Sequence, residues 1–246
     1  MDRSLYIAMS GAKQTLVAQT ANSNNLANAQ TTGFKSDFEQ FRSMPVFGPG
    51  YPTRVYAMAE RPGSDMAMGP LQTTGNDLDV AVKGDGWLAV ETNDGNEAYS
   101  RSGDLRITPE GRLENGAGLA VMGNEGPIVL PPADKIDIGS DGTISIIPIG
   151  GLATDVAVID RIKMVKPELT NLEKLNDGLM HTKDGSVLEA SAEVGLVQGA
   201  LEGSNVNAVS ALVEMIELAR NFELQTKVMK NADDNSGVSA KLMQMA

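Results

Sequence analysis

The sequence predicts an α+β protein in which a discontinuous, coiled-coil-like helical domain, built from both ends of the chain, flanks a mainly antiparallel all-β central domain. Three observations predict this class. Apolar residues recur at helical spacing in residues 1–35, the same pattern returns from Asn205 to about Met229, and residues 77–166 alternate between apolar and polar with frequent Gly-rich turns. We expect inner helical segments 1–35 and 203–246, connectors 36–76 and 167–202, and an outer β-rich domain 77–166.

The N-terminal helix carries an apolar seam whose positions alternate between intervals of four and three residues. The seam is Leu5, Met9, Ala12, Leu16, Gln19, Ser23 and Leu26. Asn22, Asn24, Asn25 and Asn28 crowd its last two turns, although asparagine is a middling helix former. Asparagine on a helix seam can fix register and oligomer state, and a solvated helix end is the alternative interpretation. Gly33 is suited to stop the helix in the left-handed conformation.

The central region changes character twice. Proline and glycine recur through 36–76, which predicts an extended or irregular connector, and the pattern weakens again in 167–202. Between these connectors short strand candidates follow one another closely. They are 78–82, 87–90, 99–102, 105–108, 112–114, 119–122, 128–130, 136–138, 143–147 and 157–165.

The C-terminal helix is expected to begin at a cap formed by Ser204 or Asn205. Its seam is Ala208, Leu212, Met215, Ala219, Phe222, Thr226 and Met229, flanked by Val209, Val213 and Ile216. Burying about ten apolar side chains at roughly 2 kcal/mol each does not offset the entropy lost by ordering about 30 residues at about 1 kcal/mol or more each. We therefore expect each helical arm to need neighbours.

Composition excludes several classes of function. A net charge of −12, a pI near 4.5 and scattered basic residues argue against nucleic-acid binding. The absence of cysteine excludes disulfides, thiolate metal sites and cysteine nucleophiles. The apolar run Leu5–Met9 is interrupted by Ser10–Gly11 and Lys13, so a cleaved export signal is not predicted, and no stretch reaches the roughly 20 apolar residues of a membrane span.

Motifs that imitate binding sites fail on inspection. Gly84-Asp85-Gly86 imitates a dinucleotide-binding loop, but Trp87–Val90 continues as a strand rather than opening a helix, so a hairpin turn is the better interpretation. Asn231, Asp233 and Asn235 alternate as calcium ligands do, but the glycine and the final carboxylate of a calcium loop are missing.

The remaining candidate groups for chemistry also favour a structural interpretation. His181 is the only histidine, which excludes His-based triads and multi-histidine metal sites. Carboxylate pairs such as Asp85 with Asp94, or Asp137 with Asp141, are typical of β-turns rather than of a glycosidase. We predict no enzymatic activity, no catalytic residue, no metal and no cofactor.

Several blocks of residues resemble the bacterial flagellar rod and hook axial proteins. They are Asn24-Asn25-Leu26-Ala27-Asn28, Thr31-Thr32-Gly33-Phe34-Lys35, Leu78–Trp87, Tyr99-Ser100-Arg101-Ser102-Gly103 and Gly203-Ser204-Asn205-Val206-Asn207. They run from end to end in the family's order. The opening Met1–Gln14, the stretch Ala219–Glu223, the tail Asp233–Asn235 and a short connector after Phe34 resemble proximal-rod members more than distal-rod members.

The resemblance implies a structural subunit of the rod that crosses the periplasm, stacked helically through its terminal helices and exported without signal cleavage. Its implied partners are further copies of itself, other proximal and distal rod subunits, the membrane-ring and export-gate base and the rod cap, with no nucleic acid and no membrane insertion. The expected assembly interface is Leu5, Met9, Leu16, Asn24, Asn25, Leu26, Asn28, Phe34, Leu212, Met215, Ile216 and Phe222. Two alternatives stay open: a distal-rod subunit, or a secreted β-domain that binds or acts on peptidoglycan.

Overall fold

The computed structural model describes residues 3–45, 55–151, 154–175 and 177–244. Its contacts divide the chain into two compact units. Unit 1 consists of Met1–Ala29, Asp37–Gly63 and Val206–Ala246, and unit 2 of Gln30–Ser36 and Ser64–Asn205. Helices occupy both ends of the chain and antiparallel strands the middle, which confirms the predicted α+β class. None of the described helices combines the length and the apolar character that a membrane crossing requires.

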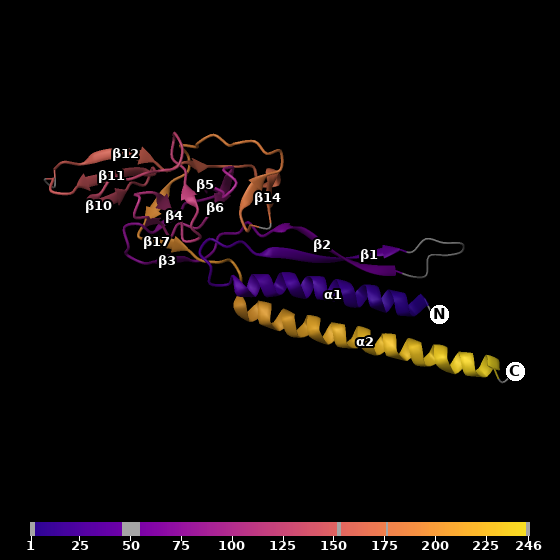
Figure 1. Ribbon diagram of the computed structural model, residues 1–246. Helices are drawn as coiled ribbons and strands as arrows, with labels where there is room; N and C mark the ends of the chain where they lie inside the picture. The colour runs from indigo at the N-terminus through magenta and orange to yellow at the C-terminus, as the bar shows by residue number, and fades with distance from the viewer. Residues whose placement is uncertain (1–2, 46–54, 152–153, 176, 245–246) are drawn as a thin grey trace. The chain divides into compact units, whose positions relative to one another are not determined.

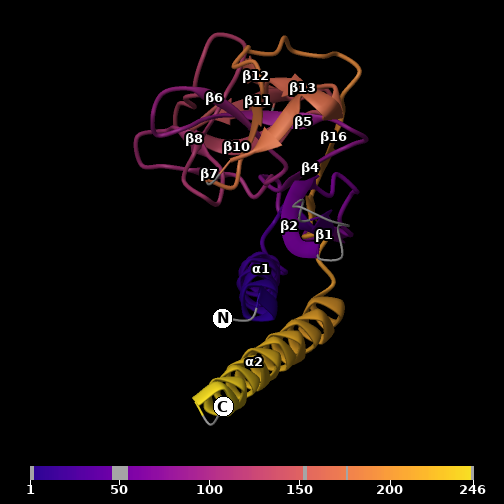
Figure 2. The same cartoon turned by 90° about the vertical axis from the view of Figure 1, so that its right-hand side faces the viewer.

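Unit 1 contains both α-helices and a two-stranded ribbon (Figure 1). Helix α1 is Arg3–Ala27 and α2 is Ala208–Gln244, while strands β1 (Asp37–Pro45) and β2 (Val55–Ser64) form the ribbon. The helices pack in opposite directions: Asn22 near the end of α1 meets Ala211 near the start of α2, and Gly11 lies against Gln225. Figure 2, which looks nearly along α1, shows α2 slanting past it.

Unit 2 contains the remaining strands. They are β3 (Leu71–Thr73), β4 (Val80–Val82), β5 (Trp87–Glu91), β6 (Glu97–Ser100), β7 (Arg106–Ile107), β8 (Leu113–Glu114), β9 (Ala120–Val121), β10 (Ala133–Ile138), β11 (Thr143–Pro148), β12 (Ala157–Arg161), β13 (Met164–Val165), β14 (Leu172–Lys174), β15 (Met180–Thr182), β16 (Leu196–Gln198) and β17 (Ala200–Glu202), with a 3₁₀ turn η1 (Leu169–Asn171). The largest sheet runs β14-β15-β6-β5-β9-β8-β7, with β13 also paired to β5. Strands β10-β11-β12 form a second sheet, and β16-β4 and β17-β3 form two small ones.

The core of unit 2 consists of large aliphatic side chains. Leu88, Leu113, Ile144 and Ile146 are among those with almost no exposed surface. A neighbouring cluster surrounds Trp87, and it includes the buried Tyr99, whose hydroxyl accepts a hydrogen bond from the Leu188 amide at 2.9 Å. These buried side chains form a core of the kind that globular domains have.

The ends of the helices correct three predictions. Helix α2 begins at Ala208 and is capped by Asn207, whose Oδ1 accepts hydrogen bonds from the amides of Val209 and Ser210, so Ser204 and Asn205 are not its caps. Helix α2 also continues past Met229 to Gln244, so the triplet that resembled a calcium loop lies inside a helix. Helix α1 ends at Ala27, well before Gly33, which adopts a φ of +69° for a different reason given below.

Three strand predictions also need correction. The turn at Gly84–Gly86 is not a hairpin, because β4 pairs with β16 while β5 pairs with β6, β9 and β13. Within 128–130 only Val129 pairs, in an isolated bridge with Arg112, and 157–165 divides into β12 and β13. Alternation of apolar and polar residues shows which side chains share one face of a sheet, but it does not show which strand pairs with which. A turn between two short strands therefore cannot be identified as a hairpin from alternation alone.

Candidate assembly surface and junction cluster

Helix α1 buries small side chains and exposes large ones. Its buried positions are Ala8, Gly11, Ala12, Thr15, Ala18 and Asn22. At Gly11 the backbone lies so close to α2 that an added methyl group would stand 3.0 Å from the Gln225 side chain. Small residues therefore allow α1 to approach its neighbours closely.

Helix α2 turns a regular face inward. Its least exposed positions recur every three or four residues and are Ala211, Met215, Leu218, Phe222, Gln225, Met229, Ala232 and Ser236. Met215, Phe222 and Met229 belong to the predicted seam, whereas the predicted Leu212 does not face inward. The buried face thus differs from the predicted one by one residue at two seam positions, with Ala211 and Leu218 in place of Leu212 and Ala219.

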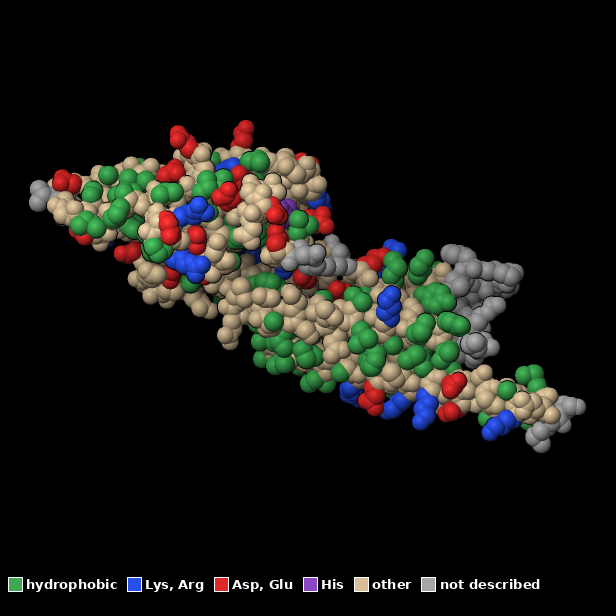
Figure 3. Space-filling view, viewed as in Figure 1, with side chains coloured by type: hydrophobic (Ala, Val, Ile, Leu, Met, Phe, Trp, Pro, Cys, Tyr) green, Lys and Arg blue, Asp and Glu red, His purple; other side chains and the backbone are tan. Residues whose placement is uncertain are grey.

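The large apolar residues that α1 and α2 leave exposed form the candidate assembly surface. On α1, Met9 is 53% and Leu16 47% exposed, and on α2, Leu212 is 48% and Ile216 62% exposed. Tyr6, Val17, Val209 and Val213 are exposed beside them. Figure 3 shows apolar side chains gathered on the visible surface of the helices and ribbon. A set of exposed apolar side chains on this scale is typical of an interaction surface.

The ribbon packs along α1 by polar contacts. Ser10 donates to the carbonyl of Ala57 at 3.3 Å, and Gln14 accepts from the Ala59 amide at 3.2 Å. On the ribbon, Phe38, Phe41 and Met44 stay about half exposed.

The predicted asparagines have different environments. Asn25 makes two hydrogen bonds with the backbone of Asp37, at 2.9 and 3.0 Å, and so fixes the start of β1 against α1. Asn28 donates to the carbonyl of Asn24, whose side chain is exposed. The asparagine between the helices is Asn22, which donates to the carbonyl of Ala211 at 2.8 Å. Sequence reasoning placed Asn22 in the cluster but did not select it as an interface residue.

The other predicted interface residues are partly covered. Leu5, Leu26, Met215 and Phe222 are half-buried within unit 1. Phe34, in unit 2, lies under the ammonium group of Lys174, which stands 3.8 Å from the ring centre. That these residues contact another subunit stays a prediction.

A buried ion cluster, which sequence reasoning missed, lies in unit 2. The Glu202 carboxylate pairs with Lys35 at 2.7 Å through Oε1 and with Arg101 at 2.8 Å through Oε2. All three side chains are at most 2% exposed. Lys35 also donates to the carbonyl of Ala67 at 2.7 Å, and the Gly69 amide donates to Glu202 at 3.0 Å. Together with Asn205, these three residues form what we call the junction cluster.

The side-chain amide of Asn205 joins its own segment to two others. Its Oδ1 accepts from the Ser36 amide at 2.8 Å, and its Nδ2 donates to the carbonyls of Asp65 at 2.9 Å and Ala67 at 3.2 Å. Because the side chain is committed to these contacts, Asn207 rather than Asn205 caps α2.

Two glycines allow the backbones at the junction cluster to meet. A Cβ on Gly33 would lie 2.3 Å from the carbonyl carbon of Arg101, and its amide donates to the carbonyl of Glu202 at 2.7 Å. A Cβ on Gly69 would lie 1.9 Å from the carbonyl oxygen of Gly203. The left-handed φ of Gly33 therefore serves packing within unit 2 and not the end of α1.

For both Glu202 and Lys35, burial and ion pairing shift the pKa in opposite directions. Burial alone would raise the pKa of Glu202, but hydrogen bonds from Lys35, Arg101 and the Gly69 amide outweigh it and hold the pKa below its usual value. Burial lowers the pKa of Lys35, and its pairing with Glu202 offsets this only in part. The cluster therefore depends on the ionised form of Glu202.

A signal for this cluster exists in the sequence, but it is weak. Leu196, Ala200 and Glu202 lie at even-numbered positions of the consecutive strands β16 and β17, and all three are buried. A carboxylate at the last of these positions therefore predicts a buried partner. Nothing in the local pattern identifies Lys35 or Arg101 as that partner.

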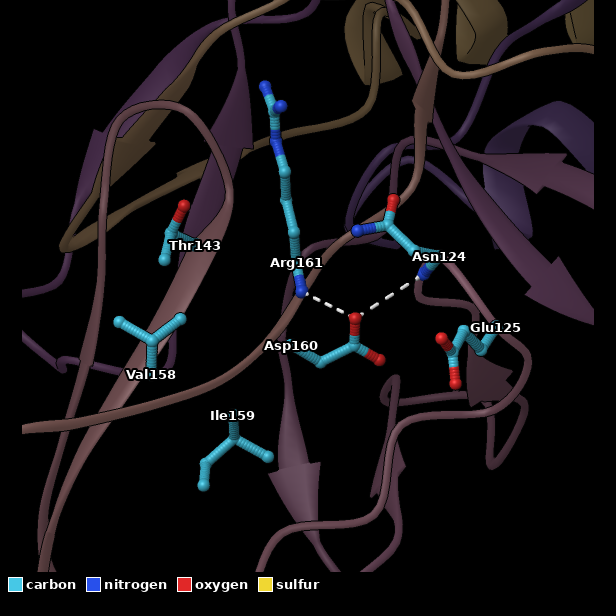
Figure 4. A pocket seen from close by; sticks show the side chains of 7 residues that line it. All are labelled: Asn124, Glu125, Thr143, Val158, Ile159, Asp160 and Arg161. Carbon is cyan, nitrogen blue, oxygen red and sulfur yellow. Dashed lines mark hydrogen bonds between the residues drawn. The ribbon is translucent and has the colours of Figure 1, made fainter.

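The β-sheet region also contains a pocket of about 390 Å³, drawn in Figure 4. It is lined by Asn124, Glu125, Thr143, Val158, Ile159, Asp160 and Arg161. The Asp160 carboxylate accepts from the backbone amides of Arg161 at 2.7 Å and Asn124 at 3.4 Å, so it serves the local loops. Within the residues that the structure describes, no group of His, Asp or Glu side chains is placed to hold a metal ion.

Three family models match consecutive parts of the chain. "Flagella basal body rod protein" matches 5–35, "Flagellar hook protein FlgE/F/G D1 domain" matches 81–146, and "Flagellar basal body rod FlgEFG protein C-terminal" matches 197–242. The chain is 42% identical to the flagellar basal-body rod protein FlgF of Escherichia coli and 40% identical to that of Salmonella typhimurium, with all of each chain covered. The chain belongs to the FlgF family of flagellar basal-body rod proteins.

Membership in the FlgF family confirms the predicted resemblance. The family is one of structural proteins of the bacterial flagellum, which serve motility, and not a family of enzymes. It places the chain in the basal-body rod and implies assembly with other rod proteins. A rod protein named FlgG, from Bacillus subtilis, is 29% identical over 95% of this chain and 96% of its own length. The two terminal matches cover most of α1 and α2, where the candidate assembly surface lies, and extend into residues 30–35 and 197–205 of unit 2.

Proposed function

We propose that this chain is a non-enzymatic subunit of the proximal rod, which packs helically with other rod subunits through α1 and α2. The proposal rests chiefly on one observation: Met9, Leu16, Leu212 and Ile216 remain about half exposed or more on helices whose buried faces are already occupied. Burying each of these side chains against a neighbouring subunit would contribute on the order of 1.5–3 kcal/mol. Many copies in a helical array would add such contributions along the whole rod.

In this proposal the terminal helices form the drive shaft and the wall of the export channel, and the β-strands of unit 2 lie outside them. The partners would be copies of this chain, proximal and distal rod subunits, the membrane-ring and export-gate base and the rod cap. The subunit would be exported without cleavage of a signal peptide. The higher identity to FlgF proteins than to the FlgG protein favours the proximal over the distal rod.

The test is complementation of a strain that lacks this gene. Ile216→Asp places a charge at the candidate assembly surface and is expected to abolish rod assembly and motility while the strands of unit 2 stay folded. Asn221→Asp adds the same charge at an exposed polar position of the same helix and should leave motility intact. Normal swimming of cells that carry Ile216→Asp would contradict the proposal.

A further inference from the structure

The chain crosses between its two units four times, and in unit 2 the residues beside all four crossings meet at the junction cluster. The crossings follow Ala29, Ser36, Gly63 and Asn205. In unit 2 the adjoining segments are 30–36, 64–70 and 199–205, which we call the linking segments. Asn205 hydrogen-bonds to the first two of them, and Asp65 also donates its amide to the carbonyl of Ser36 at 2.7 Å.

The linking segments are held mainly by polar contacts. The main apolar cluster of unit 2 draws all its residues from between Leu78 and Leu196 and includes none from the linking segments. From the linking segments, Met66 packs, partly buried, against the smaller cluster around Trp87. By contrast, the linking segments converge on Glu202, which receives Lys35 and Gly69 on its side chain and Gly33 on its carbonyl. Contacts of this kind can be lost without removing any side chain from the apolar core.

Arg101 attaches the junction cluster to the β-sheet region. It donates one guanidinium nitrogen to Glu202 and another to the carbonyl of Gly84, and its guanidinium carbon lies 5.2 Å from the ring centre of Trp87. Because Trp87 is the only tryptophan of the chain, its fluorescence reports on this attachment.

The charges of the cluster are unequal. Two buried cations share one buried carboxylate, and the Asp65 carboxylate also acts on Lys35, through its charge alone. Removing Glu202 would leave two buried cations without an ion-pair partner, whereas removing Lys35 would leave a balanced pair of Arg101 and Glu202. An unpaired buried charge costs far more than the loss of a pair with both partners removed.

We propose that the junction cluster is a latch, a conformational device in which the Glu202 carboxylate holds the three linking segments together, and that this latch can open while the largest sheet of unit 2, which contains β5 and β9, stays folded. Each of the four crossings adjoins a linking segment that Glu202 or Asn205 holds. Opening of the latch would therefore free the backbone beside all four crossings at once. This inference does not depend on the proposed rod function, since it concerns contacts within unit 2.

Hydrogen exchange measured by mass spectrometry on the full-length protein tests the latch. In Glu202→Gln, peptides that cover 30–36, 64–70 and 199–205 should exchange at least about 100-fold faster, the factor that corresponds to leaving a buried charge unpaired. Peptides that cover β5 and β9 should keep their wild-type rates. Trp87 fluorescence should change, because Arg101 loses its anchor.

Lys35→Met is the matched control, since it also removes one charge of the cluster but keeps the remaining pair balanced. It should change exchange of the linking segments much less than Glu202→Gln does. In the double variant Lys35→Met/Glu202→Gln the linking segments should exchange more slowly than in Glu202→Gln alone, because one of the two unpaired cations is gone.

Three results would overturn the proposal. The first is wild-type exchange of the linking segments in Glu202→Gln. The second is faster exchange of β5 and β9 together with the linking segments, which would make the cluster a part of one cooperative core. The third is a double variant that exchanges faster than Glu202→Gln, which would mean that the surplus positive charge does not drive opening.

Discussion

Units 1 and 2 treat apolar side chains in opposite ways. Unit 2 buries Leu88, Leu113 and Ile144 almost completely, whereas unit 1 buries Ala8, Ala12 and Ala18 and leaves Leu16 and Ile216 about half exposed or more. A unit that exposes its large apolar residues gains little from folding alone. Under the proposed function, we expect unit 2 to be stable in the monomer and unit 1 to gain further stability by association.

The largest expected effect is a cavity in the core of unit 2. Leu88→Ala should lower the free energy of unfolding of this unit by about 2–5 kcal/mol, because a fully buried leucine leaves a void that its neighbours fill only in part. Trp87 fluorescence during urea unfolding measures unit 2 alone, since the single tryptophan lies there. A loss below about 1 kcal/mol would contradict the view that unit 2 is closely packed.

The next effect concerns the close approach of the helices in unit 1. Ala12→Leu places a large side chain at a buried position of α1 and should destabilise the helical unit by about 1–3 kcal/mol through overpacking. Thermal melting followed by far-UV circular dichroism measures it, because both described α-helices belong to unit 1. Lys13→Leu, at the exposed neighbouring position, is the control and should melt near the wild type. An unchanged melting temperature of Ala12→Leu would show that small residues are not required at this face.

Acidification should have a smaller effect on global unfolding, because it acts on the junction cluster and not on the apolar core. The pKa of Glu202 is lower in the folded protein than its usual value of 4.5, so its stabilising contribution is complete above that value. The contribution is lost as the pH falls through the lowered folded pKa. As the pH is lowered, Trp87 fluorescence should therefore change at a higher pH than the pH at which the large sheet of unit 2 becomes less resistant to urea. In Glu202→Gln this fluorescence transition should be missing. If the transition persists in Glu202→Gln, other carboxylates cause it.

The sequence was sufficient for the class and the chain positions of both helices because their apolar residues repeat over several turns. It was not sufficient for the face that each helix buries. On α1 the predicted seam contained Ala12, which is buried, but also Met9 and Leu16, which are exposed. The buried face continues instead through Ala8 and Ala18, since closely packed helices favour small residues. Hydrophobicity alone therefore did not separate the buried face from the exposed one.

The junction cluster shows a second limit. Lys35 and Glu202 are separated by 167 positions, and no local periodicity relates them. Both lie in or beside the blocks that carry the family resemblance, which identified important segments without stating what their side chains contact. Only the folded structure brings Gly33, Lys35, Arg101 and Glu202 together.

The smallest expected effect on the monomer gives the sharpest test of the comparison. Leu16→Ala removes an exposed side chain, so the melting temperature of the isolated protein should change little, with a free-energy change within about 0.5 kcal/mol. Rod assembly in cells should nevertheless fall, because the same leucine would be buried against a neighbouring subunit. Counting assembled rods by electron microscopy in cells that carry Leu16→Ala, beside cells that carry Thr20→Ala at an exposed position one turn later, separates the two effects. Because Leu16→Ala should impair assembly without destabilising the monomer, wild-type rod numbers together with wild-type stability would remove Leu16 from the candidate assembly surface.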